Sequence, residues 1–363
     1  MSDATIATNG IIQGASDLPS VTVDDYNLEM RDREGGFVGD RASRRAFNEI
    51  IEDWRARLRK IDSDPLGDRQ IQEIPKGDLD ALLAKGEPEA AGLVHSAIEE
   101  FAQELATVIR RFLRIKTWES VERIVVGGGF SGSRMGELAI GRATILLKGA
   151  GQAVDLVPIR HHPDEAGLIG ALQLLPAWAF AGHDAIMAID IGGSNIRAGI
   201  VRTRQKDAAD FSKADVWKSE LWRHAEEEVD REDAMKRLFK MLKTLIAKAE
   251  KGGLSLAPLI GVGCPGLIEQ DGSISRGGQN LPGGNWEKKK FNLPRLIEAE
   301  FPEIGGHETA VVMHNDAVVQ GLSQAPFMRD ISHWGVVTIG TGLGNAVFTN
   351  KIVEDRDRQP KSK

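Results

Sequence analysis

The sequence has little cysteine, no excess of positive charge and no long hydrophobic run, and each shortage excludes a class of protein. The single cysteine, Cys264, leaves no disulfide framework and no cysteine-rich metal site, which is typical of a reducing compartment. A formal net charge of −7 argues against broad nucleic-acid binding. The most apolar run, 166–182, falls short of a membrane span and predicts a buried helix. We therefore expect a cytoplasmic protein that binds neither membrane nor nucleic acid.

Both ends of the chain differ from its middle. Residues 1–22 are rich in Ser, Thr, Gly and Asp without a clear period, and residues 352–363 are similarly polar, so we expect disordered or loosely docked tails. The first residues contain no basic segment followed by an apolar one, which argues against a signal peptide. Between the tails, helical and strand patterns alternate as in an α/β protein, and 363 residues suffice for two domains.

Hydrophobic spacing locates the main elements. Apolar residues at helical spacing predict amphipathic helices over residues 45–59, 88–115 and 230–251. Pro163 and Gly182 are typical start and stop signals of a further helix over about 163–181. Short apolar runs predict buried strands at 123–126, 154–158, 259–263 and 310–313. Two strand pairs are each joined by a glycine-rich turn, and these pairs are 185–190 with 198–202 and 335–339 with 345–348.

The first of these turns has the composition of a phosphate-binding loop. A strand ends in Asp190, and Gly192, Gly193, Ser194 and Asn195 follow before the next strand begins. Glycines let the backbone approach an anion and direct its N–H groups toward it, and Asp190 is placed to hold a hydrated Mg²⁺ against the phosphates. An ordinary hairpin turn explains the same residues. This turn alone therefore leaves both interpretations open.

The second turn, within residues 338–346, repeats the pattern with Thr341 and Gly342 at its centre. A hairpin turn is again the alternative interpretation. Two such hairpins in one chain are more informative than either alone, because two closing lobes can clamp a nucleotide between one hairpin from each lobe.

A third glycine segment follows the predicted strand 123–126. Residues 127–132 match G-x-G-x-x-G, and Asp155 stands in the next strand, as in a dinucleotide-binding fingerprint. That match alone would favour a dinucleotide-dependent oxidoreductase. In a nucleotide-binding kinase, Gly128 and Gly129 would instead form the floor beneath adenosine.

Taken together, the glycine turns and several other segments resemble the ROK family of bacterial sugar kinases and repressors. The family pattern runs D-x-G-G-T-x-x-R-x-G, G-x-G-x-P-G-x-[IV], N-L-P-x-W, N-D-A and G-T-G-x-G, followed by G-G-G and a helix with A-G-x-x-G-A. The corresponding residues here are 190–199, 261–268, 280–286, 315–317, 340–344, 127–129 and 166–171. Ser194 replaces the usual Thr of the first segment, and two extra residues precede Trp286 in the third.

The order of these segments departs from the family pattern. In the family the D-x-G-G-T strand opens the chain and the A-G-x-x-G-A helix closes it, whereas here that helix comes first. The resemblance therefore implies an actin-like/hexokinase (ribonuclease H-like) two-lobe ATPase fold that is circularly permuted, with the new break after the G-T-G-L-G hairpin. We expect a larger lobe from residues 23–165 plus 331–351 and a smaller lobe from residues 166–330. Such a permutation is easy when the old termini lie close together on the surface.

The resemblance also implies an activity and a set of site residues. It implies a kinase that transfers phosphate from ATP, with Mg²⁺ as cofactor, to a hexose, with glucose and its 6-hydroxyl as the first choice, and it implies a homodimer. Asp316 would be the general base, and Asn280 and Asn315 would bind sugar hydroxyls. From the residues alone, Asn315 or Asp316 could instead cap the helix that begins at residue 317.

One part of the family pattern is missing. Many members carry E-x-G-H and a cysteine-rich zinc site, and the sequence contains neither, so we expect no zinc. By position, Glu29 and Asp40 are the candidates for the missing carboxylate. The missing motif favours the alternative of a catalytically inactive regulator that binds sugar or nucleotide. A DNA-binding repressor would need a helix-turn-helix before the kinase body, and residues 1–22 are too few for one.

Overall fold

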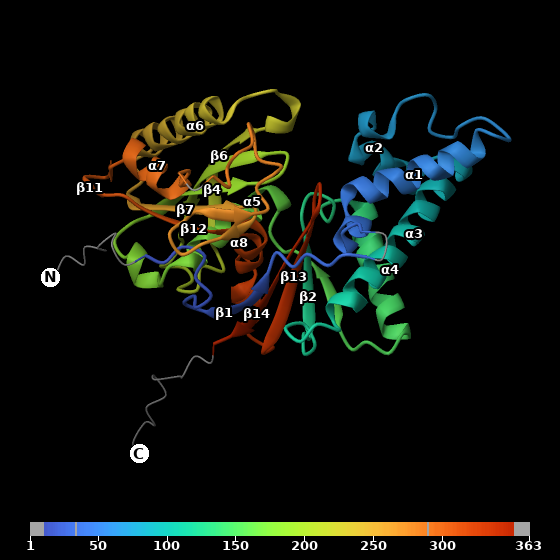
Figure 1. The fold of residues 1–363 in the computed structure, drawn as a ribbon, viewed down its shortest axis with the longest axis horizontal. Coiled ribbons are helices and arrows are strands. Elements are labelled where there is room, and N and C mark those ends of the chain that lie inside the picture. Colours follow the sequence, from blue (N-terminus) through green and yellow to red (C-terminus); the bar gives the residue numbers. More distant parts are fainter. Residues whose placement is uncertain (1–10, 33–34, 289, 352–363) are drawn as a thin grey trace, which may run out of the picture.

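A five-stranded sheet forms the centre of one half of the molecule (Figure 1). The computed structural model describes residues 11–32, 35–288 and 290–351. In spatial order the strands are β12 (Ala310–Asn315), β7 (Leu256–Cys264), β4 (Ala185–Ile191), β5 (Ile196–Arg202) and β6 (Asp215–Trp222). β5 is antiparallel to both β4 and β6, whereas β7 and β12 lie parallel to β4. Because these strands follow in chain order, we call this half the continuous lobe.

A second five-stranded sheet repeats this pattern with a different chain order. Its strands, in spatial order, are β1 (Val21–Tyr26), β14 (Leu343–Asn350), β13 (His333–Ile339), β2 (Arg123–Gly127) and β3 (Asp155–Pro158). β14 is antiparallel to β13 and β1, whereas β2 and β3 lie parallel to β13. The two sheets therefore correspond strand by strand: in order, β4, β5, β6, β7 and β12 of the first sheet match β13, β14, β1, β2 and β3 of the second. We call this half the permuted lobe, because the third strand of the pattern comes first in the chain and the first two come last.

The duplicated sheet is the actin-like, ribonuclease H-like fold that the sequence predicts, in a circularly permuted order. The break separates β14 from β1, directly after the hairpin that carries the second glycine turn. The two strands still pair across that break, with Val21 opposite Asn350.

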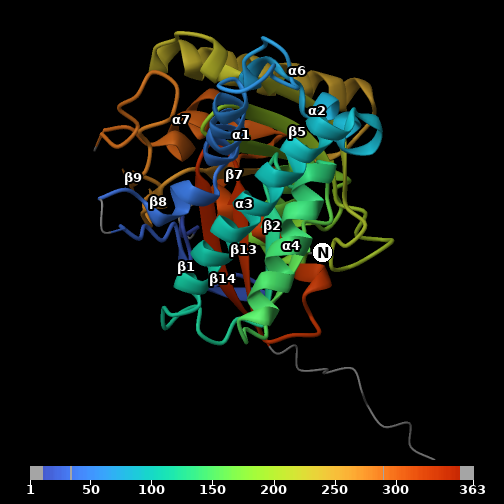
Figure 2. The same ribbon diagram turned by 90° about the vertical axis from the view of Figure 1, so that its right-hand side faces the viewer.

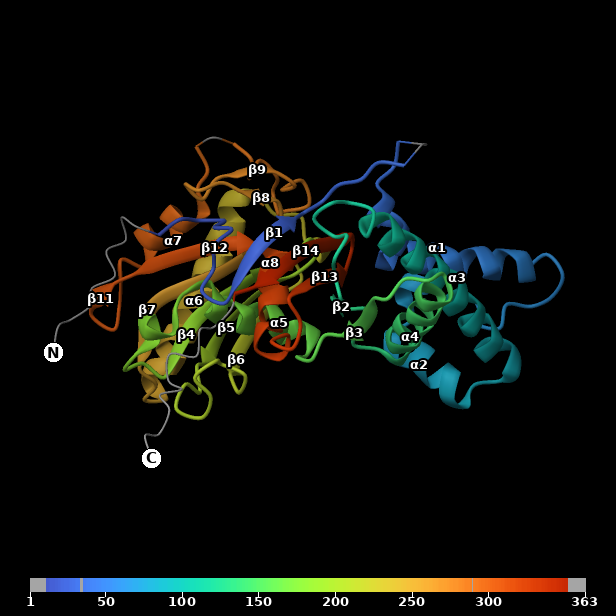
Figure 3. The ribbon, with the colours of Figure 1, turned by 90° about the horizontal axis from the view of Figure 1, so that it is seen from below.

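Helices cover both faces of each sheet. The outer face of the permuted lobe is covered by α1 (Arg44–Leu58), α2 (Lys76–Lys85), α3 (Pro88–Phe112) and α4 (Arg134–Gly149) (Figure 2). The outer face of the continuous lobe is covered by α6 (Arg231–Lys251) and α7 (Leu293–Glu300). Between the two sheets lie α5 (Pro163–Gly170) and α8 (Asp316–Leu322), within an apolar core that both sheets share (Figure 3). No helix of the described residues combines the length and apolar character needed to cross a membrane.

The packing of α5 depends on two glycines of the A-G-x-x-G-A segment. A Cβ on Gly170 would lie 1.7 Å from the backbone oxygen of Val319 in α8, and a Cβ on Gly167 would lie 2.5 Å from the carboxyl carbon of Asp190. The helix is shorter than the predicted 163–181, because two 3₁₀ turns, at 171–174 and 177–180, replace its second half. Pro176 separates these turns and offers no N–H for a continuing helix.

The segment before β1 corrects one expectation. Residues 11–20, which we call the N-terminal strap, belong to the tail predicted as disordered or loosely docked, yet they pack against the continuous lobe. Gln13 Nε2 donates to the Val311 oxygen at 2.8 Å, and the Met313 N–H donates to Gln13 Oε1 at 2.5 Å. Leu18 is buried. The strap therefore connects β12 of one lobe to β1 of the other. Residues 1–10 and the predicted tail 352–363 lie outside the described residues.

Candidate active site

A cleft of about 360 Å³ opens between the two lobes. All three glycine segments line it, together with most of the side chains that the sequence predicts for the site. The predicted residues on its wall are Gly128, Gly129, Asp190, Gly192, Gly193, Ser194, Asn195, Asn280, Asp316, Thr341 and Gly342. Segments that are far apart in sequence therefore meet at one place.

The two glycine hairpins touch each other across this cleft. The turn between β4 and β5 and the turn between β13 and β14 come together where Ser194 Oγ lies 2.7 Å from Thr341 Oγ1. A Cβ on Gly342 would meet no atom within 4 Å, and a Cβ on Gly193 would lie 3.6 Å from its nearest neighbour. The backbone of both turns is therefore open to a ligand, as a phosphate cradle requires.

The third glycine segment lies beside the second hairpin. Gly128 has a φ of +82°, and a Cβ there would lie 2.4 Å from the Ile339 oxygen at the end of β13, so only glycine fits. Its N–H donates to Gln320 Oε1 of α8 at 2.9 Å. The acidic residue of the dinucleotide fingerprint does not join this site: Asp155 is exposed, does not line the cleft and pairs with Lys148 at 2.7 Å. The oxidoreductase alternative therefore lacks the acidic residue that would bind the ribose of a dinucleotide.

The N-D-A segment divides two tasks between neighbouring residues. Asn315 caps α8, because its Oδ1 accepts from the N–H groups of Ala317 at 3.0 Å and Val318 at 3.3 Å. Its Nδ2 donates to the Gly266 oxygen at 3.0 Å. Asn315 is thus buried, bonded through both polar atoms of its side chain and absent from the cleft wall. The contact of Asn315 with sugar stays a prediction, and of the two neighbouring side chains only that of Asp316 lines the cleft.

The Asp316 carboxyl has the electrostatics of a base that works near neutral pH. Burial, and secondly the negative charge of Asp190, raise its pKa to about 7, although the N–H groups at the start of α8 oppose the rise. A general base is most effective when its pKa lies near the working pH. The same residue that the family motif designates thus has a suitable proton affinity.

Asp190 is buried at the end of β4, where it lines the cleft. Burial raises its pKa, Arg197 lowers it, and the charge of Asp164 raises it further. Arg197, on β5, also lines the cleft. Its Nη1 lies 3.6 Å from Asp190, its Nη2 bonds to Asp164, and its buried Nε has no partner among the described residues.

These carboxylates fit a hydrated cation better than a directly bound one. Asp190 and Asp316 face the same cleft closely enough for one charge to raise the pKa of the other, and a cation would relieve that repulsion. Within the described part of the chain, no group of three His, Cys, Asp or Glu side chains could hold a metal ion. A Mg²⁺ beside Asp190 would therefore keep most of its waters, as Mg²⁺ commonly does.

The remaining predicted residues lie at the other end of the cleft. Asn280 lines it from the loop after β9 (Ile274–Arg276), and its Cβ lies next to Gly193. Glu29 and Asp40 both line the cleft as well. Glu29 is exposed, whereas Asp40 lies 3.4 Å from Arg45. Both candidates for the missing carboxylate therefore remain available on geometric grounds.

Sequence reasoning missed several polar residues that line the cleft, among them Asn27, Arg44 and Gln320. Gln320 could have been found, because it follows Asp316 by four positions and so shares its face of α8. Asn27 and Arg44 lie outside every family motif, and only the docking of β1 and α1 brings them to the cleft.

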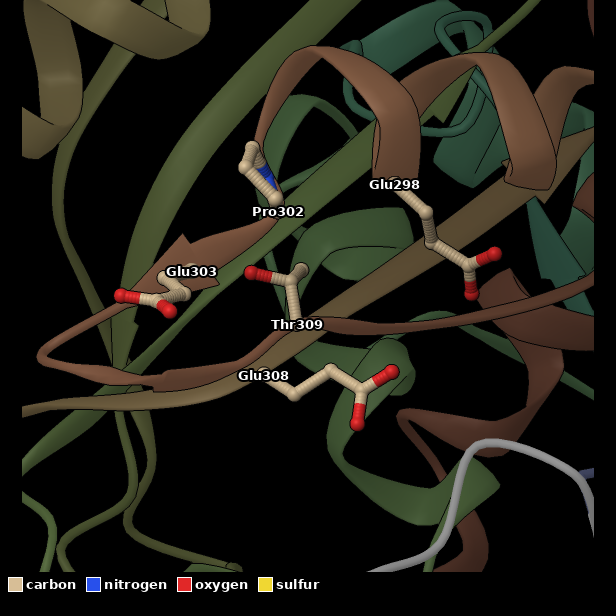
Figure 4. A pocket seen from close by; sticks show the side chains of 5 residues that line it. All are labelled: Glu298, Pro302, Glu303, Glu308 and Thr309. Atoms are coloured by element: carbon tan, nitrogen blue, oxygen red, sulfur yellow. The ribbon is translucent and has the colours of Figure 1, made fainter.

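A second hollow, of about 420 Å³, lies between α7 and the hairpin of β10 (Glu303–Ile304) and β11 (His307–Glu308). Figure 4 shows three carboxylates around it, from Glu298, Glu303 and Glu308, with Thr309 between them. It shares no residue with the cleft. We therefore build the candidate site on the cleft.

Comparison with known proteins gives a family match and distant structural matches. Residues 186–355 match the sequence model of the ROK family. The "Lmo2764 protein, a putative N-acetylmannosamine kinase" of Listeria monocytogenes is 23% identical over 46% of this chain and 47% of its own, with a TM-score of 0.33. A "putative sugar kinase" of Cytophaga hutchinsonii is 19% identical over 46% of this chain and 48% of its own, also with a TM-score of 0.33. A Ppx/GppA phosphatase of Aquifex aeolicus is 15% identical over 42% and 48%, with a TM-score of 0.25.

The chain spans about half the length of the solved structures that it matches, and no curated protein matches it. The segment that matches the family model begins in β4 and extends past β14. It thus covers the part in which the strands follow one another in the family order, whereas the G-G-G and A-G-x-x-G-A segments precede it. Residues 186–355, a little under half of the chain, are therefore similar to the ROK family.

Proposed function

We propose that this protein is an ATP-dependent sugar kinase that phosphorylates a hexose, with glucose and its 6-hydroxyl as the first candidate. The observation that carries the proposal is the position of Asp316. Its carboxyl, with a pKa raised to about 7, faces a cleft in which two glycine hairpins from different lobes meet. Phosphoryl transfer depends mainly on positioning, on charge stabilisation and on a group that accepts the hydroxyl proton.

In this proposal the chain holds two substrates in line. The open backbones of the two hairpins bind the phosphates, Gly128 and Gly129 support adenosine, and Asn280 binds a sugar hydroxyl. Asp316 accepts the proton of the attacking sugar hydroxyl. The hydroxyl oxygen bonds to the γ-phosphorus while the bond between that phosphorus and the bridging oxygen of the β-phosphate breaks. The products are ADP and hexose 6-phosphate.

Asp190 would hold a hydrated Mg²⁺ beside the phosphates, where such an ion screens phosphate charge when bound. Arg197 keeps the Asp190 carboxylate in place from 3.6 Å away. Asp164, which bonds to Arg197, fixes that guanidinium in turn.

The test is ADP release with Mg-ATP across glucose, N-acetylated hexosamines, mannose and fructose. We expect sugar-dependent ADP release from the natural protein and almost none from Asp316→Asn, with ATP binding close to normal. Asp68→Asn is the matched control, because Asp68 is exposed and does not line the cleft. A fully active Asp316→Asn variant would rule out Asp316 as the base.

A catalytically inactive regulator that binds sugar or nucleotide is the second candidate. It is favoured by the absence of E-x-G-H and by the ion pair that Asp40 makes with Arg45. The same panel separates the two candidates if sugar and ATP binding are measured by calorimetry alongside turnover. Tight binding without ADP release from any sugar would favour the regulator.

A further inference from the structure

Two cations of the permuted lobe, Arg44 and Lys76, each lie beside a glycine segment that lines the cleft. Arg44 lines the cleft, and its backbone N–H donates to the Gly340 oxygen at 2.9 Å, which fixes the residue beside the second glycine hairpin. The Lys76 ammonium donates a hydrogen bond to the backbone oxygen of Gly129. Arg44 therefore lies beside the second hairpin and Lys76 beside the third glycine segment.

The carboxylates nearest to this pair are engaged elsewhere. Asp80 accepts from the backbone N–H groups of Arg134 and Met135, each at 3.0 Å. Asp164 bonds to Arg197. Neither Arg44 nor Lys76 forms an ion pair with any residue in the described ranges. Burial, and secondly the charge of Arg44, lower the pKa of Lys76.

The charges of Asp164 and Asp80 favour the Lys76 ammonium, but burial and the charge of Arg44 outweigh them. An anion between the two cations would offset their repulsion. Arg and Lys are the side chains that bind phosphate oxygens most strongly. The anion must reach from Gly129, under the adenosine, to Gly340, at the phosphate hairpin. A chain of phosphate groups attached to a nucleoside has that shape and charge.

We propose that Arg44 and Lys76 form an anion clamp for the polyphosphate of a nucleoside di- or triphosphate, supplied by α1 and α2. The clamp rests on the proposed function, since it extends the same site. It makes the site select nucleotides by the number of their phosphates, because adenosine offers the two cations nothing to bind.

Calorimetric titration of the full chain with ADP, AMP, adenosine and inorganic tripolyphosphate tests the clamp. We expect Arg44→Ala and Lys76→Ala each to weaken ADP binding about tenfold, as expected for losing one charge-assisted hydrogen bond. Adenosine binding should be unchanged, and Lys76→Arg should restore most of the ADP affinity. Lys85→Ala, at the exposed far end of α2, is the matched control.

The outcomes separate the clamp from the kinase. If ADP binds equally to the natural protein and to both alanine variants, the clamp is wrong and the kinase proposal stands. An equal loss for adenosine and ADP would mean structural damage and would also overturn the clamp. If the natural protein binds no ADP, the kinase proposal fails, and tripolyphosphate then decides the clamp, which stands only if the double variant loses that ligand.

Discussion

Replacing Asp316 with asparagine is expected to remove turnover and to stabilise the folded protein at alkaline pH. The pKa of Asp316 rises from 3.8 to about 7 on folding, because burial and then the charge of Asp190 disfavour the ionised form. Below about pH 4 the carboxyl is protonated in both states and costs nothing. As pH rises from 4 to 7 the unfolded chain releases its proton first, so stability falls, and above 7 the loss is complete.

The size of this effect follows from the two pKa values. A rise from 3.8 to about 7 corresponds to at most about 4 kcal/mol of lost stability above neutral pH. Asparagine keeps nearly the same shape without the charge. We therefore expect the free energy of unfolding of Asp316→Asn to exceed that of the natural protein at pH 8, by up to about 4 kcal/mol, and by much less at pH 5.

Urea unfolding at pH 5 and pH 8 measures the difference directly. Asp68→Asn serves as control and should show no pH-dependent gain, because Asp68 is exposed. The rate offers a second reading in the natural protein, where kcat/KM should rise about tenfold per pH unit below 7 and level off above it. An Asp316→Asn variant less stable than the natural protein at pH 8, or a flat rate profile from pH 5 to 9, would refute the electrostatic reasoning.

Two further predictions concern the packing that holds the lobes. Gly170→Ala should lower the free energy of unfolding by about 3 kcal/mol or more, since its Cβ would lie 1.7 Å from the Val319 oxygen. Gly141→Ala in α4 is the control: its Cβ would meet nothing within 4 Å, so the free energy of unfolding should stay the same or rise by up to about 1 kcal/mol. Gln13→Ala should cost about 2 kcal/mol in urea unfolding, because it removes two hydrogen bonds to β12 and leaves an N–H unpaired. Equal stability of the two glycine variants would contradict the Gly170 contact, and a Gln13→Ala variant as stable as the natural protein would contradict the Gln13 contacts.

The parts of the site that the sequence predicted are those that local chemistry specifies. A turn such as 192–195 must be glycine-rich wherever it folds, and a strand before it is visible from its apolar run. The meeting of the two hairpins is not a local property, and the family resemblance predicts it, because each lobe of that fold supplies one hairpin. The role of Asp316 as the base is likewise a prediction from the family resemblance.

The parts that could not be predicted depend on three-dimensional docking. Whether Asn315 or Asp316 caps α8 is decided by a single side-chain rotation, and both residue types cap helices well. Arg44 and Lys76 are the first residues of α1 and α2. The local sequence of these helices does not indicate where they pack on the permuted lobe. The strap was predicted to be loose because its composition is polar, although a few contacts, such as the burial of Leu18, suffice to fix it.

The permutation gives a reason for the strap. In an unpermuted chain a short connection would hold β1 against β14, whereas here β1 must be recruited from the opposite end of the chain, which costs loop-closure entropy. Contacts outside the strand ladder offset that cost: Lys351 N–H donates to the Ser20 oxygen at 3.0 Å, Lys351 Nζ lies 2.7 Å from Asp17, and Gln13 binds β12. Since Asn27 and Glu29 follow β1 directly and line the cleft, loss of the strap would release a strand and one wall of the site together.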